Sequence, residues 1–102
     1  MYILITAAVS AEAYSLKKTL NTDNVLLGDY QELPDVLLKA GKVIQLPNPQ
    51  SSSYTHQMLT LCLDRDIDTI YTLRMQEEQL LTDARQLFAE YNINIMSAND
   101  KV

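Results

Sequence analysis

Residues 3–20, with the sequence ILITAAVSAEAYSLKKTL, decide the fold class of this 102-residue chain. The stretch begins as a short apolar run typical of a buried strand and continues as an amphipathic helix, in which Val9, Ala13, Leu16 and Leu20 form one stripe. A strand that leads directly into a helix is how nucleotide-binding α/β domains begin. The sequence therefore predicts a domain with this α/β fold.

The turn between this strand and this helix reads Ala7-Ala8-Val9-Ser10 and contains no glycine. A dinucleotide-binding turn needs glycines, because the backbone must approach a pyrophosphate closely and a Cβ atom restricts both that approach and positive φ. We therefore expect a structural turn here rather than a dinucleotide site. The free N–H groups at the start of the helix, near Ala8 and Ser10, still suit a weakly bound anion.

The alternation of strand and helix continues to the end of the chain. Strands are expected at residues 2–6, 25–29, 43–46, 68–73 and 92–96. Helices are expected to begin near residues 10, 34, 54 and 75, and the last is expected to extend to Tyr91, with Tyr91 on its inner face. This order predicts one domain over residues 1–102, a three-layer α/β/α fold with a Rossmann-like, open, mostly parallel sheet of about five strands.

Charge and composition exclude several classes of function. The formal net charge is −5 and Lys17-Lys18 is the only adjacent basic pair, so no nucleic-acid partner is expected. The apolar stretches are too short to span a bilayer and the N-terminus lacks a signal-peptide pattern, which favours a cytoplasmic protein with no membrane partner. Cys62 and His56 are each the only residue of their type, so neither an intrachain disulfide nor a metal site is predicted.

Ligands of such sheets bind beyond the carboxyl ends of the strands, where the strand order reverses. Asp29 ends the second strand, where Rossmann domains place an acid for a ribose hydroxyl; a solvated or helix-capping aspartate is the simpler interpretation. Glu77 and Glu78 follow the fourth strand, where they suit acid–base work or a substrate amine, or simply stabilise a helix dipole. The candidate substrate-binding residues are therefore Ala8, Ser10, Asp29 and Glu77, and no catalytic residue is predicted.

Several segments, taken in order, resemble the N-terminal, pre-ATP-grasp domain of ATP-grasp enzymes. This group includes biotin carboxylase, the large chain of carbamoyl phosphate synthase and many carboxylate–amine ligases. The matching segments are ILITAA (3–8), VLLGD (25–29), AGKVIQLP (40–47), YTHQMLTLCLDRDIDTIYTL (54–73) and ARQLFAEYNINIMSANDKV (84–102). The resemblance covers nearly the whole chain and implies the same α/β/α fold.

The last four residues, NDKV, resemble the junction at which the central ATP-grasp region begins, often written as an acid followed by lysine. In biotin-carboxylase-like members this lysine contacts a nucleotide phosphate, and the resemblance assigns that cofactor-binding role to Lys101. The glycine-rich flap, the other phosphate lysine and the metal-binding carboxylates of the family lie downstream of this junction. The resemblance therefore implies ATP and Mg²⁺ for the complete family enzyme and no cofactor for this chain alone.

Three functions are compatible with these observations. The resemblance implies a pre-ATP-grasp domain that is non-catalytic by itself, acts as the substrate-side or interaction module of an ATP-grasp polypeptide, and self-associates when alone. The alternatives are a small-ligand binding module that uses the crevice over the strands, and a Rossmann-like enzyme with unusual loops. Two departures from the family bear on substrate binding: the first turn, TAAVS, lacks glycines, and the family's Asp-Glu pair falls on Met75 and Gln76 when Arg85 sets the register.

Overall fold

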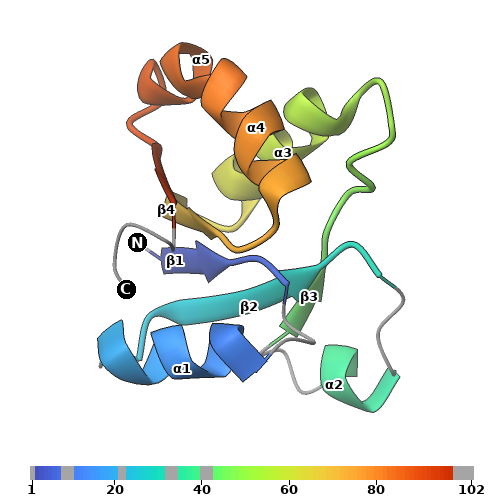
Figure 1. Ribbon diagram of the computed structural model, residues 1–102, viewed down its shortest axis with the longest axis vertical. Coiled ribbons are helices and arrows are strands. Elements are labelled where there is room, and N and C mark those ends of the chain that lie inside the picture. Colours follow the sequence, from blue (N-terminus) through green and yellow to red (C-terminus); the bar gives the residue numbers. More distant parts are fainter. Residues whose placement is uncertain (1, 8–10, 21–22, 32–34, 40–42, 98–102) are drawn as a thin grey trace.

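Five parallel strands form the middle layer of an α/β/α arrangement in the computed structural model, which describes residues 2–7, 11–20, 23–31, 35–39 and 43–97 (Figure 1). The strands are β1 (Tyr2–Ile5), β2 (Val25–Asp29), β3 (Val43–Gln45), β4 (Ile67–Thr72) and β5 (Asn94–Ser97). Their order in the sheet is β3-β2-β1-β4-β5. The predicted Rossmann-like sheet is confirmed.

The strand order places β1 at the centre of the sheet, with β2 on one side and β4 on the other. The chain first moves outward from β1 to β3 and then returns to add β4 on the opposite side of β1. The order therefore reverses between β1 and β4. Because all the strands are parallel, their carboxyl ends lie at one edge, and the crevice expected to hold a ligand lies there.

Helices cover both faces of the sheet (Figure 1). One face carries α1 (Ala11–Leu20) and α2 (Asp35–Lys39), and the other carries α3 (Tyr54–Asp64), α4 (Met75–Asp83) and α5 (Arg85–Ala89). Successive residues of a strand point to opposite faces, so Leu4 packs under the second group of helices and Ile5 packs under α1. Within the described residues, no helix combines the length and the apolar character needed to cross a membrane.

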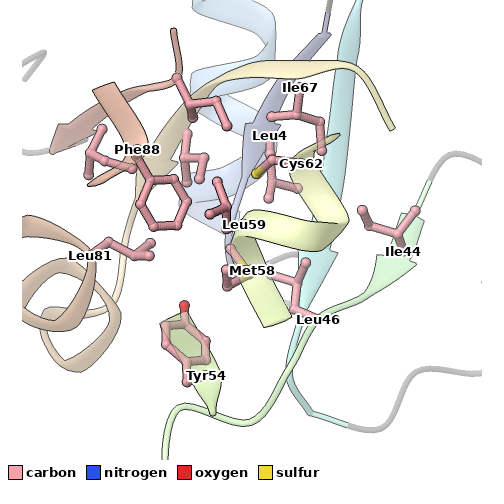
Figure 2. Packing of buried hydrophobic residues seen from close by; sticks show 13 residues of the cluster. Leu4, Ile44, Leu46, Tyr54, Met58, Leu59, Cys62, Ile67, Leu81 and Phe88 are labelled. Carbon is pink, nitrogen blue, oxygen red and sulfur yellow. The ribbon is translucent and has the colours of Figure 1, made fainter. Parts of the chain in front are cut away.

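The larger of the two apolar clusters lies between the sheet and α3, α4 and α5 (Figure 2). It is formed by side chains that are buried from solvent: Leu4, Ile44, Leu46, Tyr54, Met58, Leu59, Cys62, Ile67, Ile70, Leu81, Phe88, Ile93 and Ile95. Tyr54 lies at the margin of this cluster (Figure 2), and its side chain is buried. Its hydroxyl donates a hydrogen bond to Glu77, which links the apolar core to a polar side chain of α4.

A glycine in β2 is required by the close approach of a neighbouring side chain. A Cβ atom built on Gly28 lies 2.7 Å from Leu46 Cδ2 and 2.8 Å from Leu46 Cγ. Leu46 is itself buried, and the branch-point carbon cannot move away as the end of a flexible chain would. The space that a side chain at Gly28 needs is thus filled by Leu46.

The predicted helix over residues 75–91 is interrupted, so this prediction is wrong in part. Ala84 has φ −101° and ψ 11°, and its N–H bonds to the carbonyls of Leu81 and Thr82, which closes a tight turn between α4 and α5. The break keeps both Leu81 and Phe88 in the same cluster. Tyr91, predicted on the inner face, lies beyond the end of α5 and is 49% exposed.

Candidate functional site

The buried polar side chains of the described residues gather at the carboxyl edge of the sheet. Thr6 follows β1, Asp29 and Thr72 end β2 and β4, and Glu77 lies in the first turn of α4. Elsewhere in the described chain the buried side chains are apolar. Burying polar groups is costly unless they are paired, so their concentration at one edge marks this edge as the candidate site.

A bidentate ion pair joins two of the loops at this edge. Arg74 Nη1 donates to Asp29 Oδ1 at 2.5 Å, and Nη2 donates to Asp29 Oδ2 at 3.1 Å. Asp29 is fully buried, whereas the Arg74 side chain is 23% exposed. The guanidinium therefore lies between the buried carboxylate and solvent, and the hydrogen bonds to Asp29 raise the pKa of Arg74 above its ordinary value.

Glu77 is the second buried carboxylate of the site. The Tyr54 hydroxyl donates to Glu77 Oε2 at 2.9 Å, which connects the first residue of α3 to the first turn of α4. Glu77 Oε1 lies 3.9 Å from Arg74 Nη1 and accepts no hydrogen bond from the described residues. Burial raises the pKa of Glu77, an effect that its bond to Tyr54 and the charge of Arg74 only partly oppose.

The loop after β2 is held in place by one side-chain amide. Gln45 Nε2 lies 3.1 Å from each of three successive carbonyl oxygens, those of Asp29, Tyr30 and Gln31. The Gln31 N–H donates to Asp29 Oδ1 at 3.1 Å, and the Tyr30 ring lies 4.8 Å from the guanidinium carbon of Arg74. These contacts fix both the Asp29 carboxylate and the position of Arg74 above it.

Hydroxyl groups connect the neighbouring loops at the same edge. Thr6 Oγ1 accepts a hydrogen bond from the Leu73 N–H at 3.1 Å, and Thr72 Oγ1 donates to the Met96 carbonyl at 3.3 Å. The segment after β1 is thereby tied to the segment after β4, and the end of β4 is tied to β5. Arg74 follows this tied segment as the N-cap residue of α4, and its side chain reaches Asp29.

Ala7, the first residue of the turn after β1, adopts the left-handed conformation with φ 60°. The expectation that alanine keeps this turn out of positive φ is therefore wrong at Ala7. Two bonds of the preceding residue fix the chain that enters this turn: the Thr6 N–H donates to the Tyr71 carbonyl, and the Thr6 hydroxyl accepts from the Leu73 N–H. Ala7 therefore has the left-handed backbone conformation that glycine usually adopts at such turns.

The structure brings together two of the residues predicted for the site. Asp29 and Glu77 both lie against Arg74, and the interpretation of Asp29 as a solvated aspartate is wrong because the side chain is fully buried. Glu77 occupies the first turn of α4, the position expected of an acid that stabilises a helix dipole, and its side chain is fully buried. Ala8, Ser10 and Lys101, the other predicted binding residues, lie outside the described residues.

Sequence reasoning missed Arg74 and Tyr54. Arg74 is a cation placed just after a parallel strand, and Asp29 ends another strand, so their opposite charges at one edge of the sheet were a usable signal. Tyr54 gave no such signal, since its position at helical spacing with apolar residues is typical of core packing.

The two single-copy candidates take no part in this site. His56 is exposed on α3, and Cys62 is buried in the larger cluster. Burial raises the pKa of the Cys62 thiol to about 12, so the thiolate needed for nucleophilic or metal chemistry is not formed near neutral pH. No group of three or more histidine, cysteine or acidic side chains among the described residues is arranged to hold a metal ion.

The fold and the charged carboxyl edge define a Rossmann-like α/β domain of the pre-ATP-grasp type. More specifically, the chain belongs to the PylC-like N-terminal domain family, whose model matches residues 3–96. The resemblance seen in the sequence is thus confirmed, and no ATP-grasp region is detected within the 102 residues.

A solved structure shares the fold at low sequence identity. The chain is similar to L-threonine 3-dehydrogenase from Trypanosoma brucei, with 19% identity and a TM-score of 0.51 over 93% of this chain and 35% of that chain. The chain therefore spans about a third of the dehydrogenase, and the likeness concerns the fold alone. Comparison with curated protein sequences gave no match.

Proposed function

We propose that this chain is the substrate-side module of an ATP-dependent ligase of the ATP-grasp type and is non-catalytic by itself. Another segment or another chain supplies the ATP-grasp region, which binds ATP and Mg²⁺. Membership of the PylC-like N-terminal domain family supports a ligase-related role. The observation that carries the proposal is the buried cluster of Asp29, Arg74 and Glu77 at the carboxyl edge, where a domain of this fold binds small molecules.

The cluster suits the recognition of a small polar substrate. Two carboxylates face one guanidinium, and Arg74 is the member that reaches solvent. A substrate amine that enters beside Arg74 meets acceptor oxygens, while the guanidinium offers donors to a substrate carboxylate. Asp29 and Glu77 are binding residues in this proposal, and Arg74 positions them.

The surface beside the cluster supports docking of an ATP-grasp polypeptide. Met75 follows Arg74 directly and is 82% exposed, which is unusual for a large apolar side chain. Arg74, which precedes Met75, stacks on the Tyr30 ring, and arginine and tyrosine are enriched in the centres of protein interfaces. An ATP-grasp region that packs here closes the substrate crevice and covers Met75. Alone, the chain is expected to self-associate through the same surface.

The test fuses this chain to the ATP-grasp region of a PylC-like ligase from which the N-terminal domain has been removed. Amine-dependent conversion of ATP to ADP is expected from the fusion and from neither part alone. Arg74→Ala in the fusion is expected to abolish the amine-dependent conversion of ATP to ADP. Arg65 is an exposed arginine after α3, and Arg65→Ala is expected to leave this conversion intact. ATP turnover by the isolated chain, or equal turnover by both variants, contradicts the proposal.

A second candidate function rests on Glu77 Oε1, which accepts no hydrogen bond from the described residues. A free amine or amino acid bound at this oxygen makes the chain a ligand-binding module in its own right. Thermal unfolding with amino acids, diamines, nucleotides and phosphate tests this function. A ligand at a hundred times its Kd adds about 2.7 kcal/mol of stability, and a uniform absence of any shift argues against the module.

A further inference from the structure

The charged cluster at the carboxyl edge contains two carboxyl groups and one guanidinium among the described residues. Asp29 and Glu77 are both fully buried, and Arg74 is the cation paired with them among the described residues. Both terminal nitrogens of Arg74 bond to the two oxygens of Asp29. Glu77 Oε1 lies 3.9 Å from Nη1, beyond hydrogen-bond distance. The guanidinium thus gives its hydrogen bonds to Asp29 and meets Glu77 only at 3.9 Å.

Among the described residues, the titratable groups that act on Glu77 lie on α3, at the start of α4 and at the end of β2. Tyr54, on α3, donates to Oε2; Arg74 precedes Glu77 by one helical turn; and the Asp29 carboxylate at the end of β2 faces both from across the cluster. Tyr30, next to Asp29, stacks on the guanidinium rather than on Glu77. A negative charge on Glu77 would be stabilised by the Tyr54 hydroxyl and by a cation shared with Asp29, and destabilised by the Asp29 charge. These contacts do not offset the cost of burying a charged carboxylate.

Burial is the largest influence on this side chain and raises the pKa of Glu77. The Asp29 charge acts in the same direction, while Tyr54 and Arg74 oppose it. The geometry agrees with this direction, because a carboxylic acid needs no donor at the oxygen that carries its proton. Oε1 is such an oxygen, and Oε2 remains free to accept from Tyr54.

We propose that Glu77 stores a proton on Oε1 in the folded protein, at pH values where an exposed glutamate is already ionised. In this state the cluster is electrically balanced, with Arg74 paired to Asp29 and Glu77 neutral. Loss of the proton creates a second buried carboxylate, which draws Arg74 Nη1 across the 3.9 Å gap and loosens the two-point pair with Asp29. The proton therefore decides how one guanidinium is divided between two carboxylates. This device is independent of the proposed ligase role.

The test is a pH titration of the whole chain by NMR, with ¹³C at the side-chain carboxyl of glutamate and ¹⁵N in the guanidinium of arginine. The chain has five glutamates. One carboxyl signal is expected to titrate at higher pH than the other four, and the Arg74 guanidinium signals are expected to move with the same midpoint. Five overlapping titrations, or a late carboxyl titration without movement at Arg74, overturns the proposal.

Variants assign the carboxyl signal that titrates at the highest pH, here called the late signal. Glu77→Gln keeps the shape of the side chain and is expected to remove that signal, whereas Glu78→Gln, the same change one residue along, is expected to leave it in place. Tyr54→Phe serves where Glu77→Gln does not fold: loss of the donor to Oε2 favours the neutral acid and moves the late midpoint to higher pH. A late signal that persists in Glu77→Gln, or that Tyr54→Phe leaves unmoved, assigns the proton elsewhere and overturns the proposal.

Discussion

The guanidinium of Arg74 and the carboxylate of Asp29 bridge the two strands that flank β1. Their two hydrogen bonds connect residues 45 positions apart in the chain, one at the end of β2 and the other just after β4. The pair thus crosses the point at which the strand order reverses. It lies at the edge of the sheet where a ligand is expected, and it ties the two halves of the sheet together.

Removal of the cation from this pair is expected to be strongly destabilising. Arg74→Ala leaves Asp29 buried without its partner, and the expected loss is about 2–4 kcal/mol of unfolding free energy, reduced from the range for fully buried pairs because Arg74 is partly exposed. Urea unfolding measures the loss. The double variant Asp29→Asn/Arg74→Ala is expected to lose less than the sum of the two single changes; strict additivity means that the pair does not couple.

Glu77 gives the stability of the protein a pH dependence of defined sign. Its pKa is raised in the folded state above the ordinary 4.5. Between these two pKa values the folded chain holds a proton that the unfolded chain has lost, so the unfolding free energy falls as pH rises, by about 1.4 kcal/mol per pH unit at most. Glu77→Gln is expected to weaken this pH dependence and to be more stable than the wild type at pH values above the pKa of Glu77 in the folded state. Chemical unfolding over a pH series measures both curves, and parallel curves contradict the prediction.

The hydroxyl of Tyr54 is expected to contribute to stability through Glu77. Tyr54→Phe removes the single donor that the described residues provide to the Glu77 carboxyl, and a cost of about 1–3 kcal/mol follows from leaving that group unsatisfied. Tyr14→Phe is the matched control, since Tyr14 is exposed on α1, and its effect is expected within about 0.5 kcal/mol. Equal effects in the two variants would show that the buried hydrogen bond contributes nothing.

Gly28→Ala is expected to destabilise the sheet by overpacking. The new methyl group meets Leu46 at less than van der Waals distance, and inserted core atoms of this kind cost about 1–3 kcal/mol. That cost exceeds the gain of about 0.4–1 kcal/mol from a stiffer unfolded chain. Leu46→Ala is expected to be destabilising alone but to relieve the clash in the double variant, so a thermodynamic cycle shows favourable coupling. The absence of coupling means that the backbone, not Leu46, absorbs the methyl group.

Ala7→Gly is expected to leave stability within about 0.5 kcal/mol of the wild type. Relief of the left-handed alanine, about 1 kcal/mol, is offset by the greater freedom of glycine in the unfolded chain. Ala13→Gly is the control, because Ala13 is equally buried but lies within α1, where the same change costs about 1 kcal/mol or more. Calorimetry distinguishes the two, and comparable losses would show that φ at Ala7 carries no strain.

The fold could be predicted because its signals are local. Apolar runs alternate with amphipathic helices, and parallel strands must place their carboxyl ends together, so Asp29 and Glu77 were assigned to one edge from position alone. The break at Ala84 could not be predicted, since Leu81 and Phe88 face the same core and the helical period continues across it. The positive φ of Ala7 was hidden for another reason: bonds to Tyr71 and Leu73 from the preceding residue fix the chain that enters this turn, and they join segments more than sixty residues apart.

The chemistry of the site depended on tertiary contacts. Nothing local distinguishes Glu77 from Glu78, yet one is buried against Tyr54 and the other is partly exposed. Burial raises the pKa of Glu77, and that burial follows from how α3 and α4 pack. The partner of Tyr54 lies 23 residues later in the chain, which no spacing rule reveals.

The ion pair across β1 also bears on the order in which the chain folds during synthesis. During synthesis Asp29 leaves the ribosome long before Arg74, so a nascent chain that contains only β1, β2 and β3 has no guanidinium to cover this carboxylate. Such a fragment lacks the two hydrogen bonds that Arg74 gives to Asp29. The first three strands are therefore expected to be less stable as a fragment than in the complete sheet, which gains this ion pair only once the segment after β4 has emerged.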